Sequence, residues 1–332
     1  MTRPDAMLTT VIIGCGDIAG GYDEASDGAT VLSHAGAYRA DGRFDVVACV
    51  EPDAARRQAF RDRWDVRSGF GNLDACLKDQ DGFDVASICT PTDTHEVVLT
   101  QLLDSPARIV FCEKPMTGDP AHSAALHKAY EAAGKAICVN YLRRWDSEMT
   151  TLRDELAAGD WGALRSVTAF YAKGLFHTGS HMLDLIQFLI GPLTPQQALR
   201  RNEDFSPADP TIDAMLTGPK DIPVYLIGSD SRDYARFEAE ITCAGGVVRI
   251  EDSGFRVRRR RTTDHRLFPG RTHLDEGTVT ETTLDRALSG AVDNIHSAVT
   301  QGAALASTAE TAISVERLCQ QISQLRLMGA TS

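Results

Sequence analysis

The chain of 332 residues holds 34 lysines and arginines against 46 aspartates and glutamates, which gives a formal net charge of −12. Such an acidic protein is poorly suited to gain affinity from nucleic-acid phosphates or from a membrane surface, so we expect neither partner. Its length allows about two domains. Its content of hydrophobic residues, 43%, is typical of a globular protein, and no apolar run is long enough to span a bilayer.

The eight cysteines stand apart from one another, without a Cys-x-x-Cys pair, and most of them lie in apolar runs. This pattern favours buried, reduced thiols and argues against a zinc site. The first residues lack the apolar stretch and the cleavage site of a signal peptide. We therefore expect a cytoplasmic protein.

Between residue 9 and about residue 140, short apolar runs alternate with longer amphipathic segments. The runs are 9–14, 44–51, 83–90, 108–113 and 136–141, and the helix-like segments are 53–64, 94–104 and 121–133. Runs that are apolar on both faces are typical of parallel strands covered by helices. The alternation predicts an α/β protein whose residues 1–145 form a Rossmann domain with a doubly wound parallel sheet.

The pattern changes beyond residue 150. A helix over 147–158, a strand over 164–173 and an apolar helix over 181–190 are followed by strands over 236–243 and 247–251, joined by a glycine pair that suits a tight hairpin. Two final helices, 283–300 and 308–326, are expected to serve packing. Residues 146–332 are therefore predicted to form an α+β domain on a largely antiparallel open sheet.

The first apolar run leads into Gly14-Cys15-Gly16-Asp17-Ile18-Ala19, which fits the pattern Gly-x-Gly-x-x-Ala. Gly14 permits a tight turn, Gly16 lets the backbone approach a pyrophosphate, and a helix that starts here, at Asp17 and Ile18, offers its amides to the anion. The position at the first strand of a βα series predicts a dinucleotide site. The alternative is a glycine-rich turn without a ligand.

The acidic residue Glu51 follows the next apolar run. A carboxylate there accepts hydrogen bonds from the ribose hydroxyls and repels a 2′-phosphate, which favours NAD over NADP. A polar insertion over 21–30 explains the long spacing between Glu51 and the glycines. Arg56 and Arg57 could hold a 2′-phosphate, so NADP remains the less favoured alternative.

Four further segments carry a resemblance. Residues 88–95 read ICTPTDTH, 111–115 read FCEKP, 139–145 read VNYLRRW and 179–184 read GSHMLD. In this order, and with the glycine turn, they resemble the glucose-fructose oxidoreductase / inositol dehydrogenase (Gfo/Idh/MocA) family over nearly the whole chain.

The resemblance implies a Rossmann domain, a second domain whose open sheet packs against another subunit, and a site in the cleft between them. It also implies hydride transfer between NAD and a secondary ring hydroxyl or ketone of a sugar, a cyclitol or a nucleotide sugar, by a homodimer or homotetramer. The alternative from a different class is a non-catalytic NAD-binding sensor or scaffold, because a fold alone does not imply activity.

Several candidate cofactor contacts follow strand ends, which line the ligand crevice of an open α/β sheet. They are Thr90, Pro91, Thr92, His95, Glu113 and Lys114. Lys114, beside a substrate oxygen, would stabilise a developing alkoxide and help to relay its proton. The alternative for Lys114 is a structural ion pair with Glu113.

By the resemblance, His181 is the acid–base group, and Asp184 lies one helical turn further on and could orient its ring. The alternative is that His181 merely opens an apolar helix after an N-cap at Ser180. Many members of the family carry an aspartate where this chain has His177, and the substitution puts inositol specificity in doubt because a ring replaces an obligate acceptor. The surrounding pattern resembles a subset that is associated with surface-polysaccharide and nucleotide-sugar genes.

His177, His181 and Asp184 could also be metal ligands. We expect no metal, because Gly179 and Ser180 should interrupt the shared helix, and hydroxyl oxidation by NAD needs no metal when Lys114 and His181 are present.

Tyr141, Arg144 and Lys173 are expected to flank the substrate, with Arg144 or Lys173 available to a phosphate or carboxylate group. Exposed salt bridges are the alternative for these residues. The basic run over 256–261 is expected to protect a strand edge or to pair with acidic neighbours.

Overall fold

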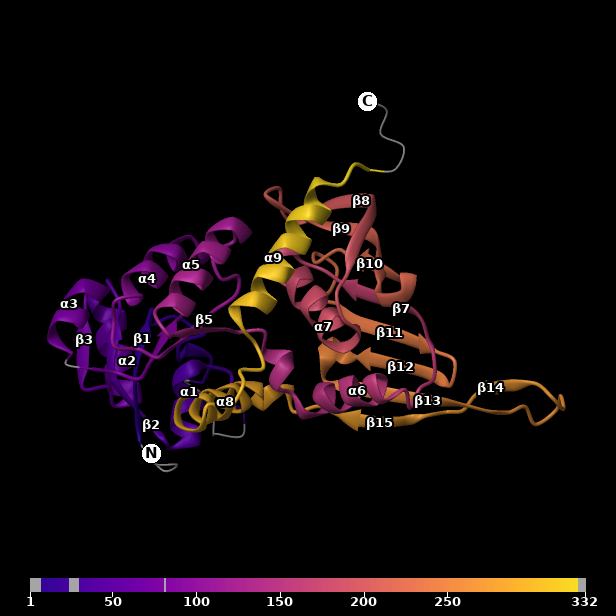
Figure 1. The fold of residues 1–332 in the computed structure, drawn as a ribbon, viewed down its shortest axis with the longest axis horizontal. Coiled ribbons are helices and arrows are strands. Elements are labelled where there is room, and N and C mark those ends of the chain that lie inside the picture. The colour runs from indigo at the N-terminus through magenta and orange to yellow at the C-terminus, as the bar shows by residue number, and fades with distance from the viewer. Residues whose placement is uncertain (1–6, 24–29, 81, 328–332) are drawn as a thin grey trace. The chain divides into compact units, whose positions relative to one another are not determined.

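A computed structural model describes residues 7–23, 30–80 and 82–327. The chain divides into two compact units (Figure 1). The first unit combines the chain up to Trp145 with Asp285–Ser314, and the second combines Asp146–Leu284 with the chain from Val315 onward.

The first unit is built on a six-stranded parallel sheet with the order β3-β2-β1-β4-β5-β6. The strands are β1 (Leu8–Ile13), β2 (Phe44–Val50), β3 (Ser68–Phe70), β4 (Val85–Ile88), β5 (Ile109–Cys112) and β6 (Ala136–Val139). The strand order reverses between β1 and β4, the position at which open α/β sheets bind ligands. The predicted doubly wound parallel sheet is confirmed.

Four of the five helices in the N-terminal segment of this unit begin at a polar side-chain cap. The five helices are α1 (His34–Asp41), α2 (Ala54–Trp64), α3 (Leu73–Asp79), α4 (His95–Leu102) and α5 (Pro120–Ala132), with 3₁₀ turns at Gly21–Asp23, Thr92–Thr94 and Leu142–Trp145. Side chains of Ser33, Asp53, Asn72 and Asp119 each accept a hydrogen bond from an amide in the first turn of α1, α2, α3 and α5. Sequence analysis predicted α2, α4 and α5 but not α1, β3 or α3.

We had expected the glycine turn to lead directly into a helix, and this prediction is wrong. Residues 16–20 form turns that lead into the 3₁₀ segment, and α1 begins only at His34. The adjacent pair Gly20 and Gly21 disfavours a helix at this point. Part of the expected polar insertion, residues 24–29, lies outside the described residues.

Helix α8 (Ala287–Gln301) belongs to the first unit, although we had assigned this segment to the second domain. It follows a 3₁₀ turn at Leu284–Arg286. Leu288, Val292, Ile295 and Val299 recur at helical spacing and join the core that also holds Tyr38 of α1. An amphipathic pattern predicts that a helix has a buried face but not which core that face covers.

The second unit is built on a nine-stranded sheet with the order β14-β13-β12-β11-β7-β10-β9-β8, in which β15 pairs with β13. The strands are β7 (Leu164–Tyr171), β8 (Thr194–Ser206), β9 (Asp209–Gly218), β10 (Ile222–Gly228), β11 (Phe237–Cys243), β12 (Gly246–Glu251), β13 (Arg256–Asp264), β14 (Thr272–Leu274) and β15 (Thr278–Glu281). Among the strands of this sheet that the structure describes, β7 and β10 are the one parallel pair, and the other neighbours are antiparallel. The predicted largely antiparallel sheet is confirmed, as is the hairpin of β11 and β12.

The helices of the second unit are α6 (Ser147–Ala158), α7 (Ser180–Ile190) and most of α9 (Ala309–Gln324). Shorter helical segments are the π-turn at Gly174–Gly179 and 3₁₀ turns at Pro219–Asp221 and Asp252–Gly254. Alternating burial along β7, β10 and β11 gives the sheet one buried and one partly exposed face.

The basic run lies in β13, which is paired on both sides, so it does not protect a strand edge. Three of its arginines bind acidic side chains, as the other expectation required: Arg256 binds Glu281, Arg258 binds Glu251, and Arg259 binds both Glu148 and Glu155. All eight cysteines are buried free thiols. Of the helices in the described ranges, none combines the length and the apolar character that crossing a membrane requires.

Candidate active site

The glycine turn shapes a cavity at the carboxyl ends of β1, β2 and β4. Gly14 has φ of +88°, and a Cβ atom there would lie 2.7 Å from the carbonyl oxygen of Cys89, so the turn requires glycine. A Cβ atom on Gly16 would meet nothing within 4 Å. Both glycines line a cavity of about 620 Å³, together with Glu51, Thr90 and Pro91.

One amide of the glycine turn donates to a side chain, whereas the next three are available to a ligand. The Cys15 amide donates to Oε2 of Glu51 over 3.1 Å. Within the described part of the chain, the amides of Gly16, Asp17 and Ile18 have no hydrogen-bond acceptor. Such consecutive amides can bind an anion even without a following helix. The side chains of Asp17 and Ile18 do not line the cavity, and Ile18 packs against the core.

Glu51 is a buried acid fixed at the cavity wall. Its Oε1 accepts from the Asp53 amide over 3.0 Å, and Nη1 of Arg56 lies 3.7 Å from the same oxygen. Arg56 lines the cavity, whereas Arg57 donates to the backbone carbonyls of Glu51 and Pro52. Of the two arginines that sequence analysis considered, only Arg56 therefore faces the place expected for the adenosine ribose.

His95 holds two loops together. The ring is 1% exposed, with Nδ1 2.8 Å from the carbonyl oxygen of Pro115 and Nε2 2.9 Å from that of Thr90. It therefore connects the loop after β4 to the loop after β5. Like His95, Thr92 is not part of the cavity wall.

Glu113 is bound by two residues that sequence analysis did not single out. Its Oε1 accepts from Nδ2 of Asn140 over 2.7 Å and lies 2.9 Å from Nε2 of the fully buried His34. Burial acts to raise the pKa of Glu113, but the hydrogen bonds and charge of His34, with smaller effects from Asn140 and Lys114, outweigh it and leave the pKa below its ordinary value. The residue before Lys114 is thus a firmly held carboxylate. A cis peptide bond joins Lys114 to Pro115.

In the second unit, His181 lies in the first turn of α7. The π-turn continues directly into this helix, so Gly179 and Ser180 do not interrupt the helical path, and our reason against a shared helix was wrong. Ser180 is not an N-cap either, because its Oγ donates to the carbonyl of Phe176 over 2.7 Å. His177 and His181, four residues apart, therefore lie on one face. Asp184 is buried in the same helix.

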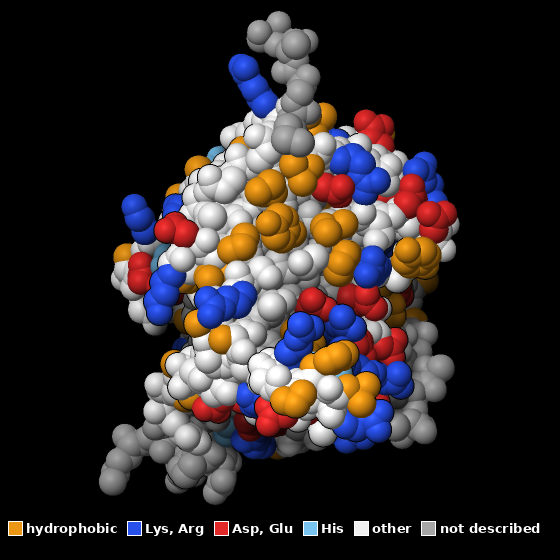
Figure 2. Space-filling view, turned by 90° about the vertical axis from the view of Figure 1, so that its right-hand side faces the viewer, with side chains coloured by type: hydrophobic (Ala, Val, Ile, Leu, Met, Phe, Trp, Pro, Cys, Tyr) orange, Lys and Arg blue, Asp and Glu red, His pale blue; other side chains and the backbone are white. Residues whose placement is uncertain are grey.

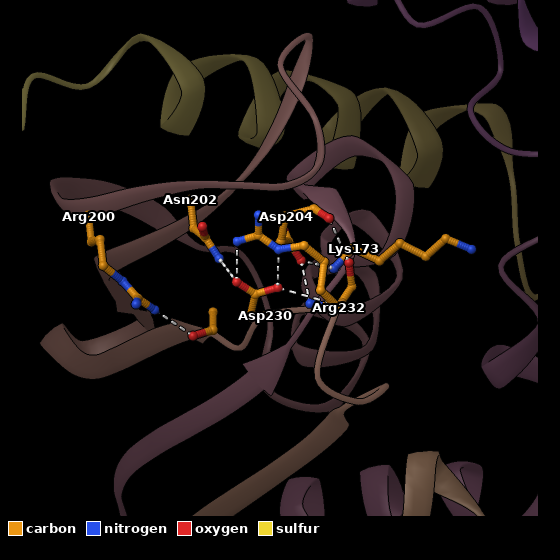
Figure 3. A network of polar contacts seen from close by, with 8 residues as sticks. Lys173, Arg200, Asn202, Asp204, Asp230 and Arg232 are labelled. Atoms are coloured by element: carbon orange, nitrogen blue, oxygen red, sulfur yellow. Dashed lines mark hydrogen bonds and ion pairs between the residues drawn. The ribbon is translucent and has the colours of Figure 1, made fainter.

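The π-turn is held by side chains from β8 and β9, and Figure 3 shows Asp204 of β8 beside Lys173, at the start of this turn. Lys173, in the left-handed region with φ of +70°, donates its amide to Oδ2 of Asp204 over 3.0 Å. The Gly174 amide donates to Oγ1 of Thr211, and Asp209 accepts from the amides of Phe176 and His177.

Tyr141 and Arg144, which were expected to flank the substrate, both lie in the first unit. The Tyr141 side chain is buried in the first unit, and Nη1 of Arg144 lies 3.4 Å from the carbonyl oxygen of Ala306.

Among the described residues, a single group of histidine and carboxylate atoms is close enough to hold a metal ion. It comprises His127, Glu131 and Glu310 rather than His177, His181 and Asp184.

Sequence analysis missed His34, Asn140, Asp204, Phe205 and Asp209 as parts of these arrangements. Asn140 stood within a segment that carried the resemblance, which was the available signal. His34 lies far from Glu113 in the sequence, and we found no signal that pairs them.

The parallel sheet, the glycine turn, the acid after β2 and the cavity at the reversal of strand order define a Rossmann-type dinucleotide-binding unit. Residues 8–141 match the family described as "Oxidoreductase family, NAD-binding Rossmann fold". Over these residues the chain is therefore similar to members of the Gfo/Idh/MocA oxidoreductase family.

Curated relatives and solved structures resemble the chain to different extents. An inositol 2-dehydrogenase from Leifsonia xyli subsp. xyli is 32% identical over 158 residues, 44% of this chain and 46% of that protein. The chain thus spans about half the length of this relative. The WlbA dehydrogenase from Chromobacterium violaceum, solved with NADH and UDP-GlcNAcA, superposes with a TM-score of 0.75 at 16% identity over 97% of this chain and 94% of that one. KijD10, a 3-ketoreductase from Actinomadura kijaniata solved with NADP and TDP-benzene, gives 0.76 at 17% identity over 95% and 97%. At these identities, the two structures establish the fold of the chain.

Proposed function

We propose that the protein is a cytoplasmic NAD-dependent oxidoreductase that transfers a hydride between nicotinamide and a secondary ring hydroxyl or ketone of a sugar, a sugar derivative or a nucleotide sugar. The observation that carries the proposal is the cavity bounded by Gly14, Gly16 and Glu51, with Lys114 on the next loop along the same sheet edge. The relatives support it, since they include an inositol dehydrogenase and a protein solved with a nucleotide sugar. Eight buried free thiols suit the reducing cytoplasm.

Bound NAD would supply the hydride acceptor. Gly16, Asp17 and Ile18 would hold its pyrophosphate through their amides, and Glu51 would accept hydrogen bonds from the ribose. Lys114 would stabilise negative charge on the substrate oxygen as its proton leaves, and His181 would accept that proton. Glu113, whose side chain is fixed by His34 and Asn140, would position Lys114 by restricting the backbone next to it.

The test is a panel of sugars, cyclitols and UDP-sugars assayed by NADH absorbance. We expect turnover of at least one compound and a loss of about 10²- to 10⁴-fold in kcat for Lys114→Ala, since one positioned proton-transfer group contributes that much. NADH binding, measured by fluorescence, should persist in this variant, because the turn amides and Glu51 remain in place. Binding of NADH without turnover of any compound would favour a non-catalytic sensor. Preference for cyclitols would favour the inositol-type alternative.

The preference for NAD over NADP is a separate proposal based on Glu51. Its carboxylate is fixed by the amides of Cys15 and Asp53, where it would repel a 2′-phosphate. Glu51→Ala should lower the ratio of NAD to NADP affinity by about tenfold or more. Asp74→Asn, an acid that also lines the cavity, is the matched control. An unchanged Michaelis constant for NAD in the Glu51 variant would remove this assignment.

We also propose that the partly exposed face of the second unit's sheet joins two copies of the chain. Strand register aligns, across this face, Met215, Tyr225, Thr168, Glu240, Arg249 and Arg258 in one row, and Ile227, Phe170 and Glu238 in the next. The face is thus apolar on one half and charged on the other, and Figure 2 shows apolar side chains gathered among charged ones on this side of the molecule. Such a surface can pair with itself about a two-fold axis.

Light scattering of the purified protein tests this interface. We expect a dimer or tetramer for the natural sequence and a monomer for the double variant Tyr225→Glu, Ile227→Asp, because the new charges would be buried without partners. Tyr234→Glu, which changes an exposed tyrosine outside the face, should leave the mass unchanged. A monomeric natural protein would refute the interface.

A further inference from the structure

Lys173, His177 and Phe205 form a cluster on the surface of the second unit, which we call the Lys173 cluster. The His177 and Phe205 ring centroids lie 4.9 Å apart with planes inclined by 31°, and Nζ of Lys173 lies 5.5 Å from the Phe205 centroid. Phe205 is 45% exposed, and the other two side chains are also exposed. The Phe205 ring attracts the Lys173 ammonium through its face and packs against the His177 ring, so it holds both side chains at one place.

The backbone beneath the cluster is held in a costly conformation. A lysine in the left-handed region costs about 1 kcal/mol or more relative to ordinary backbone. Asp204, only 7% exposed, stabilises it by accepting from the amides of Lys173 over 3.0 Å and Ser231 over 2.8 Å. Strain that is held by buried partners is typical of positions where a side chain must be placed accurately.

The amides at this point are already used. Those of Gly174, Phe176 and His177 donate to Thr211 and Asp209 over 2.8 to 2.9 Å. A Cβ atom on Gly174 would lie 2.3 Å from Oδ2 of Asp209, which shows how closely this acid approaches the turn. A ligand at the cluster would therefore be bound by side chains rather than by the backbone.

The neighbouring charges pair among themselves. Asp230 binds Arg232 and Asn202, and Asp213 binds Arg200. Figure 3 shows the Lys173 side chain running away from Asp204 and Asp230. Among the described residues, no carboxylate oxygen lies within 4 Å of its Nζ. The ammonium is thus directed away from the acids that fix its backbone.

We propose that Lys173 and His177 bind an anionic group of the substrate, a carboxylate or a phosphate, and that Phe205 is a positioning residue for both. The inference rests on the proposed function. His177 lies one turn before His181 on the same face, so the anion would be bound beside the residue that we propose as the proton acceptor. The substrate class narrows to acidic or phosphorylated sugars and their nucleotide derivatives.

Matched substrates provide the test. Calorimetric titration of the full-length protein loaded with NADH compares D-glucose with D-glucuronate and D-glucose 6-phosphate, and the same compounds are assayed for turnover with NAD. We expect at least one anionic probe to bind about tenfold or more tightly than D-glucose, since charge-assisted hydrogen bonds contribute that much. Tighter binding of D-glucuronate would indicate a carboxylate site, and tighter binding of D-glucose 6-phosphate would indicate a phosphate site.

Variants connect this preference to the cluster. Lys173→Ala should remove the tenfold preference by weakening the anionic probe alone, and Lys173→Arg should keep most of it. Phe205→Ala should raise KM for the anionic probe several-fold with little change in kcat, and Phe205→Tyr should restore it. Lys220→Ala is the control, because Lys220 is also an exposed lysine with positive φ, 59°.

Equal affinity for D-glucose and both anionic probes would overturn the inference, as would an equal loss on all probes in Lys173→Ala. A preference for the anion that depends on Lys173, without turnover of any compound, would support the anion site and refute the proposed function. Turnover that depends neither on the anionic group nor on Lys173 would support the proposed function and refute the anion site.

Discussion

Gly14 and Gly16 stand two positions apart in one turn, but a methyl group would meet different surroundings at each. Gly14→Ala should lower the melting temperature, because its Cβ would lie 2.7 Å from the Cys89 carbonyl oxygen at φ of +88°. Gly16→Ala should melt like the natural protein and bind NADH about tenfold or more weakly, because its Cβ would enter the cavity. Calorimetry and NADH fluorescence separate the two effects. Unchanged NADH affinity in Gly16→Ala would contradict a pyrophosphate position there.

Glu113 should make stability depend on pH in the acid range. Its pKa in the folded protein lies below the ordinary value of 4.5, so the unfolded chain takes up this proton first as the pH falls. The contribution of Glu113 to the stability of the folded protein is therefore complete well above pH 4.5. It is lost as the pH falls towards the pKa of Glu113 in the folded state.

Glu113→Gln should consequently be less stable at neutral pH and lose less stability on acidification. Urea unfolding between pH 7 and pH 3 measures both. Glu96→Gln, which changes an exposed acid paired with His122, is the control. Parallel pH curves for the natural protein and Glu113→Gln would refute the account.

Among the secondary structure elements, β13 and α6 are joined by one partly buried arginine. The Arg259 side chain, 14% exposed, binds Glu148 and lies 3.0 Å from Oε2 of Glu155, which also accepts from Trp161 over 2.9 Å. Removing one partner of a buried ion pair leaves uncompensated charge, so Arg259→Ala should cost about 3 kcal/mol. Arg256→Ala, which removes an exposed pair with Glu281, should cost about 1 kcal/mol or less. Denaturant unfolding followed by circular dichroism compares them, and equal losses would contradict the role of burial.

The sequence predicted elements well where burial imposes a pattern. The strands β1, β2, β4, β5 and β6 are apolar on both faces, and the hairpin turn at Gly245 and Gly246 has a backbone requirement of its own. Strands β8 and β9 were missed because their polar residues and irregular register hide the alternation. The π-turn was missed because its support, Asp204, Asp209 and Thr211, lies 30 residues or more along the chain.

The candidate site could be predicted in the same way. Gly14, Gly16 and Glu51 belong to a local pattern with a local physical reason, and the structure places all three at one cavity. The contacts of His34 with Glu113 and of Phe205 with His177 join distant segments. A single sequence carries no signal for such pairs.

For the whole chain, the division of the first unit into two segments leads to a prediction about fragments. A fragment that ends at Trp145 lacks Leu288, Val292 and Ile295 of α8, so apolar surface of α1 should be exposed. We expect it to bind a hydrophobic dye and to unfold without cooperativity. Attaching residues 285–314 through a flexible linker should restore cooperative unfolding and NADH binding. Cooperative unfolding of the shorter fragment would contradict this.

The late position of α8 has a consequence for synthesis. A ribosome makes Tyr38 some 250 residues before the segment that covers it, and at ordinary elongation rates that interval lasts about ten seconds or more. Throughout that interval, the apolar surface of α1 that α8 later covers remains exposed on the nascent chain. Chaperones that bind apolar segments would find this surface on the nascent chain but not on the folded protein.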